Sequence, residues 1–445
     1  MNTQPSLAES KPPSSSTRRL SSQGPGELSF HKVMVVLAAC MALQMTSFVM
    51  ILPVFARRFS ELGAGADALA ASAMAYALAS TLASPFMGAL ADRFGQRPLV
   101  LGSLAVYVLA FSGYLFASSA PVFILLRGLA GAFTAGLVPA VTGIVANLAP
   151  KQQRAQWIGI VNGGASIGWI AGPLLGGVLY DHWGWPVPFV VSIIMAAVAF
   201  TMAFLTVPET CNHPGRPIVE TERSAQAFLP GNLRRSLRTF RASLPGSLSA
   251  LILMLGIYFA VMFAWAFIEP RFMFYAYDDL GWSSSMLGLV MSTYGIAMTL
   301  GEFSLSRLSD RLGRKPVIIF GLVLFAAQFA GLAFSRDYVW IAVTFVIAGL
   351  GNALFDPALS ACILDIAPAD RQGQILGIKN TAGSLGSILG PAMVVLFTPL
   401  IEAQGIFLIA TGIVFLITLI SVSVKIRPYT NQIGLVASII NRDSN

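Results

Sequence analysis

The sequence predicts an all-α membrane protein with twelve transmembrane helices in two pseudo-symmetric six-helix bundles. Hydrophobic residues make up 56% of the 445 residues and charged residues only 11%, whereas soluble domains carry about 25% charged residues. The apolar residues fall into twelve stretches, each long enough for the roughly 20 residues that a helix needs to cross a bilayer. An internal sequence repeat divides these stretches into two sets of six.

The first bundle is expected over residues 31–207, after a disordered N-terminal tail. Residues 1–30 contain Ser, Pro, Lys and Arg with too few apolar side chains to offset the entropy of ordering. The first apolar stretch is too long for the core of a signal peptide, so we count it as a true span. The expected spans of this bundle cover residues 33–55, 68–91, 98–117, 121–147, 155–180 and 186–207.

A polar linker separates the first bundle from the second. Residues 208–244 form the only long polar interval between spans and carry arginines at 216, 223, 234, 235, 238 and 241. The second bundle is expected over residues 245–427, followed by a C-terminal tail over 428–445. Its expected spans cover residues 246–275, 283–306, 316–334, 338–366, 372–398 and 404–425.

The distribution of Lys and Arg predicts the orientation in the membrane. Cytoplasmic loops are enriched in these residues, and a cytoplasmic N-terminus places most of the 28 Lys and Arg residues on the inner side. We therefore expect a multi-pass protein of the cell membrane with both termini and the linker in the cytoplasm. The net charge of +8 then reflects topology and contact with anionic lipids rather than nucleic-acid binding. The exceptions are Arg57, Arg58, Arg271 and Arg336 on the outer side, and Arg127 and Lys379 within spans.

Two homologous halves are indicated by identities at a constant offset of 218 residues. Two half-sequences in the same orientation are typical of transporters in which one half rocks against the other around a central site. The first-half members of the matched pairs are, in order, Asp92, Gly95, Pro98, Pro150, Gly159, Asn162, Ser166, Gly168, Gly172 and Pro173. Their second-half partners, in the same order, are Asp310, Gly313, Pro316, Pro368, Gly377, Asn380, Ser384, Gly386, Gly390 and Pro391.

The fifth expected span contains glycines at every fourth position, which places them on one helix face. Such a face lets another helix backbone approach closely in lipid. Close packing alone explains the pattern, but Pro173 and the pair Gly176 and Gly177 also favour a bent helix that acts as a hinge. The second half has Val394 and Val395 in place of that pair, which suggests a role beyond packing. The face consists of Gly164, Gly168, Gly172 and Gly176.

Three segments resemble motifs of the major facilitator superfamily. Residues 88–101, GALADRFGQRPLVL, are similar to the signature between helices two and three, and depart from it in Gln96 and in Arg97 for Lys. Residues 306–319 repeat it. Residues 168–177, GWIAGPLLGG, resemble the antiporter motif of the twelve-helix drug:proton antiporters, and Arg127 with its neighbours looks like a degraded helix-four motif of that group.

The resemblance implies a conformational latch at the two signature turns. An aspartate at a helix end can pair with a nearby arginine or face the N-terminus of a neighbouring helix, where the dipole favours an anion. A solvated turn that only enforces topology is the alternative. The candidate latch residues are Gly88, Asp92, Arg93, Gly95, Arg97, Asp310, Arg311, Gly313, Arg314 and Lys315.

Ionisable residues inside spans are costly and mark candidate proton or substrate sites. Arg127 cannot lose its proton, so it either biases a nearby acid, holds a substrate anion or forms a structural pair. Glu269 precedes Pro270, which is expected to break helix seven there, and is either the protonation site or an interfacial charge. Glu302 lies near the inner end of helix eight, where a structural role is favoured.

Asp356 and Lys379 are expected to share a depth in the inner half of the bilayer. At 1.5 Å per residue they lie about 15 Å and about 12 Å from the inner ends of helices ten and eleven. A short loop joins these helices, so they run antiparallel and adjacent. The pair is interpreted either as a structural clamp or as a pair that lines the cavity and opens on protonation.

Other chemistry has little support in the sequence. His31, His182 and His213 are widely separated, so no metal site or catalytic base is predicted. No phosphate-binding G-x-x-x-x-G-K-[ST] motif occurs, so no ATP-driven motor is expected. Cys40, Cys211 and Cys362 do not form a disulfide framework. We therefore expect no cofactor and an ion gradient as the energy source.

These observations predict a secondary active transporter, not an enzyme, that exports small, largely apolar organic compounds in exchange for protons by alternating access. This is multidrug-type efflux, with a cavity lined by helices one, four, seven, ten and their neighbours. The expected partners are the small-molecule substrate, protons and membrane lipids, with no nucleic acid and no ATP, and the protein is expected to be monomeric. The alternatives are an uptake symporter or facilitator for a metabolite, and a membrane-embedded lipid-modifying enzyme, which is disfavoured because no catalytic cluster is present.

Overall fold

The computed structural model describes residues 25–150, 152–208, 248–305, 308–367, 372–398 and 400–423. The predicted C-terminal tail, and all but the margins of the predicted N-terminal tail and linker, lie outside these residues. The first helix begins at Pro25, within the stretch that composition assigns to the tail.

The first half contains six membrane crossings. Two of them are interrupted, at Ile51 and at residues 135–136, and each interruption comes shortly before a proline, Pro53 or Pro139, which has no N–H to donate. The elements are α1 (Pro25–Met50) with α2 (Leu52–Glu61), α3 (Ala66–Phe94), α4 (Gln96–Phe116), α5 (Ala120–Thr134) with α6 (Leu137–Leu148), α7 (Arg154–Trp183) and α8 (Pro186–Thr206).

The second half contains the other six crossings. Pro270 does not break its first helix as the sequence predicts: α11 continues to Phe274 and then widens into a π-helical turn, η1. The elements are α11 (Leu248–Phe274) with η1 (Tyr275–Asp279), α12 (Ser284–Leu305), the short α13 (Leu308–Leu312), α14 (Arg314–Phe334), α15 (Tyr338–Ile366), α16 (Gln372–Phe397) and α17 (Ala403–Ser423).

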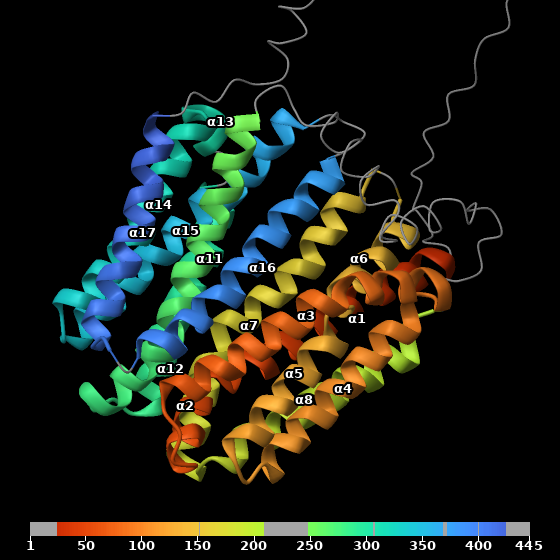
Figure 1. Ribbon diagram of the computed structural model, residues 1–445. Helices are drawn as coiled ribbons and strands as arrows, with labels where there is room; N and C mark the ends of the chain where they lie inside the picture. Colours follow the sequence, from red (N-terminus) through yellow and green to blue (C-terminus); the bar gives the residue numbers. More distant parts are fainter. Residues whose placement is uncertain are drawn as a thin grey trace, which may run out of the picture.

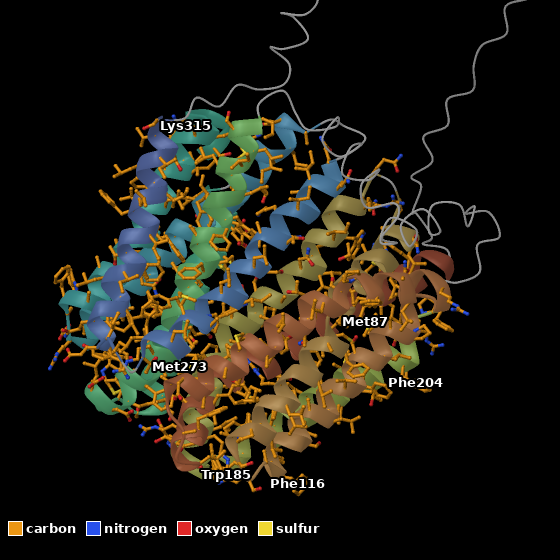
Figure 2. All side chains as sticks on the ribbon, in the orientation of Figure 1. Met87, Phe116, Trp185, Phe204, Met273 and Lys315 are labelled. Carbon is orange, nitrogen blue, oxygen red and sulfur yellow. The ribbon has the colours of Figure 1, made fainter. Side chains whose placement is uncertain are left out.

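The predicted fold class is confirmed. Twelve helices of the described chain are long and apolar enough to cross a membrane. Large apolar side chains cover the outside of the bundles: those of Phe116 and Phe204 point away from the molecule and are 84% and 52% exposed (Figure 2). Such a surface suits acyl chains rather than water.

The two halves share one packing scheme (Figure 1). In the first half α1 packs on α7, α3 on α5 and α4 on α8. The equivalent helices of the second half pair in the same way: α11 on α16, α12 on α15 and α14 on α17. We call the face where α1 begins the inner face, and the opposite face, where α2 ends, the outer face. Across the boundary between the halves, α7 packs on α12 and α3 on α16.

Candidate functional site

A cavity of about 460 Å³ lies between the halves. Helices one, four and seven line this main cavity as predicted, together with helices two, five and eleven. Helix ten (α15) is absent from its described lining, and α16 supplies that wall instead. The walls are aromatic at Phe48, Tyr76, Trp169, Tyr258 and Trp265, polar at Ser80, Thr81, Asn380, Ser384 and Ser387, and charged only at Arg127 and Glu269.

Arg127 lies in the wall of the first half, on α5. Its side chain is 6% exposed, and its guanidinium lies 4.6 Å from the ring centre of Phe55, 5.1 Å from Tyr76 and 5.4 Å from Phe48. Its Nε has no hydrogen-bond partner, and no carboxylate of the described residues lies within ion-pairing distance. Aromatic faces stabilise the cation, which forms no direct ion pair with a carboxylate of the described residues.

Glu269 lies in the opposite wall, on α11 of the second half, and takes part in no ion pair of the described residues. The structure therefore brings the predicted candidates Arg127 and Glu269 to one cavity, with one charge on each half. Two opposite charges in a largely apolar chamber attract strongly, because the surroundings screen them poorly.

The halves close against each other at the outer face. Arg57 of α2 donates to the carbonyl of Trp282 at 2.9 Å and lies 4.0 Å from the ring centre of Tyr277, whose hydroxyl donates to the carbonyl of Pro53 at 2.8 Å. Arg57 is one of the few outer-side cations of the sequence, and this contact explains its position.

Asp181 of α7 caps the first turn of α12 across the boundary. Its Oδ1 accepts from the Ser284 N–H at 3.1 Å, and its Oδ2 accepts from the Ser285 N–H at 2.7 Å and the Ser285 hydroxyl at 2.6 Å. A carboxylate at a helix N-terminus satisfies orphan N–H groups and suits the helix dipole. Here the cap and the helix belong to different halves, so the contact stabilises the outer-closed state.

Removing this cap should shift the protein toward outward opening. An N-cap contributes about 0.5–2 kcal/mol, so Asp181→Ala is expected to raise the outward-open population about fivefold. A cysteine introduced at Ser80 in a background without the native cysteines reports this as faster labelling by an impermeant thiol reagent from outside. Asp337→Ala is the matched control, because Asp337 caps α15 within its own half, through the Trp340 N–H at 2.8 Å. Equal labelling in the Asp181 variant and wild type would contradict the assignment.

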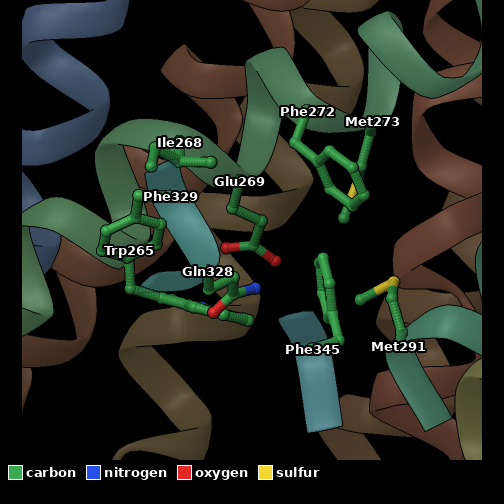
Figure 3. Close-up of a pocket in the computed structure, with 9 residues that line it drawn as sticks. All are labelled: Trp265, Ile268, Glu269, Phe272, Met273, Met291, Gln328, Phe329 and Phe345. Atoms are coloured by element: carbon green, nitrogen blue, oxygen red, sulfur yellow. The ribbon is translucent and has the colours of Figure 1, made fainter. Parts of the chain in front are cut away.

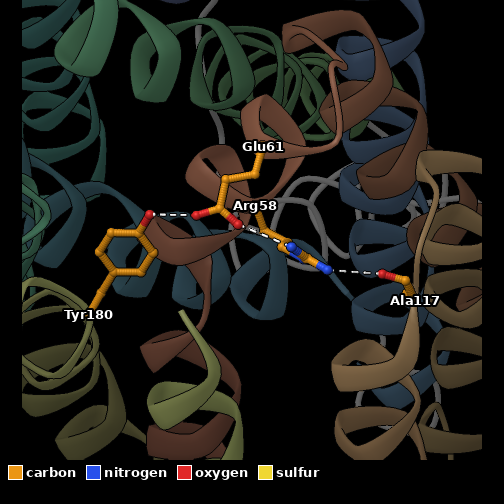
Figure 4. Close-up of polar contacts among 4 residues, drawn as sticks. All are labelled: Arg58, Glu61, Ala117 and Tyr180. Atoms are coloured by element: carbon orange, nitrogen blue, oxygen red, sulfur yellow. Dashed lines mark hydrogen bonds and ion pairs between the residues drawn. The ribbon is translucent and has the colours of Figure 1, made fainter. Parts of the chain in front are cut away.

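A second set of outer contacts braces the first half internally (Figure 4). Glu61 accepts from the Tyr180 hydroxyl at 2.9 Å and from Arg58 at 3.0 Å, and Arg58 also donates to the Ala117 carbonyl at 3.2 Å. These bonds join α2 and α7 to the residue that follows α4 at the outer face of the first half.

The glycine face of α7 packs on α1 in the same half. A Cβ at Gly164 would lie 2.5 Å from the Ala38 carbonyl oxygen, and one at Gly176 would lie 1.8 Å from that of Met50. Gly168 and Gly172 also face α1 backbone. In the second half, Gly386 and Gly390 lie against α11 in the same way. These glycines therefore allow close packing within each half, and the hinge role of α7 stays a prediction.

The opposite side of α7 meets the other half. A Cβ at Gly177 would lie 2.1 Å from the Ser284 carbonyl oxygen. Conversely, Cβ atoms at Gly288 and Gly295 of α12 would lie 2.2 Å and 2.5 Å from the carbonyl oxygens of Pro173 and Trp169. Because Pro173 has no N–H, the helical hydrogen bond to the Trp169 carbonyl is absent at this point of α7. The N–H of the next residue, Leu174, donates to the Ser292 hydroxyl of α12 at 3.2 Å. The proline and Gly177 thus lie at the boundary that must open.

The two signature turns have the same architecture. Gly95 and Gly313 have φ of 94° and 90°, which only glycine adopts readily. Arg97 donates to the Phe204 carbonyl and Lys315 to the Val422 carbonyl, again residues related by the repeat offset. Each basic residue therefore ties its turn to the last helix of its own half.

The departure at Gln96 has a structural explanation. In the second half Arg314 pairs with Asp365 at 3.1 Å; at the equivalent positions of the first half, Asn147 donates to Gln96 at 3.0 Å. The turn of the second half is therefore held by an ion pair, and the turn of the first half by a hydrogen bond between two amide side chains. The side chains of Asp92 and Asp310 lie outside the described residues, so the latch role of these turns stays a prediction.

The predicted meeting of Asp356 and Lys379 is confirmed. Their side chains form an ion pair at 2.5 Å, and Lys379 also donates to Ser360 at 2.6 Å. Its ammonium lies 4.2 Å from the ring centre of Tyr258, which lines the main cavity. The lysine side chain is 6% exposed and that of the aspartate 41%. Glu302 of α12 is exposed and close enough to Asp356 for their charges to repel.

Sequence reasoning missed several residues of this site. Asn352, one turn from Asp356, donates to the Tyr294 hydroxyl at 2.5 Å, and Gln328 is buried on α14 behind Glu269. A polar residue within an apolar span was the available signal for both. Asp181 carried no such signal, because its partners lie more than one hundred positions away.

Two six-helix halves of common design around a shared cavity, closed at one face, are the arrangement of membrane transporters that rock one half against the other. The family comparison agrees: the model of the Major Facilitator Superfamily matches residues 34–275 and 254–436. The chain belongs to the Major Facilitator Superfamily.

The relatives of this chain include resistance proteins. It is 27% identical over 321 residues to the tetracycline resistance protein, class C, of Escherichia coli, covering 72% of this chain and 77% of that protein. It is 24% identical over 340 residues to the multidrug resistance protein MdtG of Klebsiella pneumoniae, covering 76% and 78%.

Solved structures share the fold. The human organic anion transporter MFSD10 (TETRAN) aligns with a TM-score of 0.64 at 20% identity, over 88% of this chain and 99% of that one. A mutant of the nucleoside transporter NupG aligns with a TM-score of 0.69 at 14% identity, over 88% and 99%.

Proposed function

We propose that the protein exports small, largely apolar organic compounds across the cell membrane in exchange for protons. The observation that carries this proposal is the main cavity, in which aromatic walls surround one buried cation on the first half and one acid on the second. The names of the resistance proteins among its relatives support the direction of transport. The inner face is assigned to the cytoplasm by the distribution of Lys and Arg.

Glu269 is the proton carrier in this proposal and Arg127 its counter-charge. The guanidinium stays charged at all relevant pH values, so only the glutamate changes state. When Glu269 is ionised, the two charges attract across the cavity and draw the halves together unless a substrate lies between them. When Glu269 takes up a proton from the outer side, this attraction is lost and the substrate leaves.

A single copy of the chain suffices for this cycle, because both walls of the cavity come from one polypeptide. We therefore propose a monomer as the working unit.

Replacing the carboxyl group tests the carrier. Glu269→Gln keeps the size of the side chain but cannot ionise, so proton-driven export is expected to fall at least a hundredfold while substrate binding is retained. The assay uses purified protein in proteoliposomes, an imposed pH gradient of either sign, and a fluorescent dye that the wild type transports, chosen from a panel of cations and neutral compounds.

The matched control is Asp278→Asn, because Asp278 is an exposed acid near the outer end of the same crossing. It is expected to transport at the wild-type rate. Proton-driven export by Glu269→Gln at that rate would overturn the assignment of the carrier. Accumulation rather than export under the same gradient would favour the uptake alternative.

A further inference from the structure

The lining of the main cavity is unevenly divided among its helices. Apart from the tyrosines, every hydroxyl and amide side chain of the described lining lies on α3 or α16. These two helices pack against each other across the boundary between the halves, so their polar side chains belong to one side of the cavity. The aromatic side chains come mainly from α1, α7 and α11.

The polar side chains on α3 and α16 differ in what they bind. The Thr81 hydroxyl donates to the Ala77 carbonyl at 2.7 Å, a bond that Ser and Thr commonly make inside helices. The other four form no hydrogen bond with any described residue, and we call them the polar wall. They are Ser80 of α3 and Asn380, Ser384 and Ser387 of α16.

The three α16 members of the polar wall follow one another along one helix face. Their spacing of four and then three residues places them on the same side of the helix, and at 1.5 Å per residue they span about 10 Å. Hydroxyl and amide groups both donate and accept hydrogen bonds. The row can therefore bind hydroxyl, carbonyl or amide groups of a ligand, while Phe48, Trp169 and Trp265 offer aromatic surface to a flat ring system.

A second cavity lies inside the second half and shares Trp265 and Glu269 with the main one (Figure 3). Its volume is about 20 Å³, which is room for about one water molecule. Of these two cavities, only the main one is large enough for a transported compound. The polar wall is therefore in the cavity that a substrate can enter.

We propose that the main cavity selects flat ring compounds that carry several uncharged hydrogen-bonding groups along one edge, and that the polar wall recognises this edge. The inference deepens the proposed function and rests on it only in treating the main cavity as the substrate site. Before a compound binds, water satisfies the four side chains. A compound with matching groups replaces these bonds, whereas a purely apolar one displaces the water and leaves the side chains unpaired, so the site rejects it.

Three fluorescent anthracenes test this selectivity. The compound 1,8-bis(hydroxymethyl)anthracene carries both hydroxyl groups on one long edge, its 1,5 isomer carries them on opposite edges, and 1,8-diethylanthracene has methyl groups in place of the hydroxyls. None of the three ionises, and the two diols have the same composition. Binding is measured by energy transfer from tryptophan to the anthracene, with purified protein in lipid nanodiscs at constant pH.

The wild type is expected to prefer the compound with both hydroxyls on one edge. Because one hydrogen bond changes affinity about two- to tenfold, the 1,8-diol should bind about fivefold more tightly than the 1,5 isomer and at least about tenfold more tightly than the diethyl compound.

Two variants remove parts of the polar wall. Ser384→Ala combined with Ser387→Ala should lower the affinity for the 1,8-diol about tenfold and leave that for the diethyl compound within about twofold. Asn380→Leu, which removes the amide at similar size, should change the two affinities in the same direction. Thr381→Ala is the matched control on α16, because the Thr381 hydroxyl donates to the Gly377 carbonyl at 3.0 Å and does not line the main cavity.

The outcomes distinguish this inference from the proposed function. Equal affinity of the wild type for the three compounds, or no binding of any of them, would overturn the selectivity. A preference that both polar-wall variants retain would show that other residues recognise the edge. If Glu269→Gln keeps proton-driven export while the wild type still distinguishes the isomers, the proton carrier is wrongly assigned and this inference stands.

Discussion

Adding a single methyl group at Gly177 is expected to abolish transport while leaving the protein folded and abundant in the membrane. The new Cβ would lie 2.1 Å from the carbonyl oxygen of Ser284 and 2.5 Å from its carbon, in the backbone of the other half. Backbone cannot yield as a flexible side chain can, so Gly177→Ala should prevent the outer face from closing. The α1 and α7 packing within the first half does not use this position.

Two neighbouring glycines make this experiment selective. Gly176→Ala would place a Cβ 1.8 Å from the Met50 carbonyl oxygen in the same half, so this variant should lose abundance as well as transport. Gly163→Ala meets nothing within 4 Å and should behave as wild type. The measurements are the amount of protein in the membrane fraction and export of the dye per molecule. Export at the wild-type rate by Gly177→Ala would mean that transport does not require this outer contact.

Breaking the pair of Asp356 and Lys379 is expected to have the second large effect. Removing one partner of a buried pair costs about 3–5 kcal/mol, and the lower end applies here because the Asp356 side chain is 41% exposed. The two single changes should differ. Asp356→Asn leaves a lysine that is 6% exposed without its counter-charge, whereas Lys379→Met leaves an aspartate that water can reach. The loss of abundance should therefore be greater for Asp356→Asn.

The neutral double variant decides what the pair does. If Asp356→Asn with Lys379→Met restores both abundance and transport, the pair is a structural clamp; if abundance returns without transport, the pair takes part in the cycle. Additive losses would show that the two residues do not interact in the working protein. Asp365→Asn, at the more exposed pair with Arg314, is the control and should cost about 0–1 kcal/mol.

The fold was accessible from sequence because its determinants are periodic along the chain. Apolar stretches of bilayer length located the crossings, and a constant offset revealed the two halves. The depth of Asp356 and Lys379 followed from the constant helical rise and a short loop, and their ion pair confirms it. The meeting of these two residues was predictable because it depends only on positions along two helices joined by one tight connection.

Contacts between distant segments were not accessible in the same way. Spacing defines the glycine face of α7 but cannot name the helix it faces, and only the structure assigns α1 to that face and α12 to the other side. Pro270 was expected to end a helix, yet α11 passes through it and adjusts one turn later as a π-helix. Helix ten was expected in the cavity wall, and α16 occupies that position.

Part of the outer barrier is main chain: the carbonyl of Pro173 rests on Gly288 of α12, and the carbonyl of Ser284 rests on Gly177. Main-chain atoms do not change when side chains are substituted. The aromatic and polar residues of the main cavity can therefore be exchanged, one at a time, with little consequence for how tightly the outer face shuts. We therefore expect substitutions in the main cavity to change which compounds bind without disturbing these main-chain contacts.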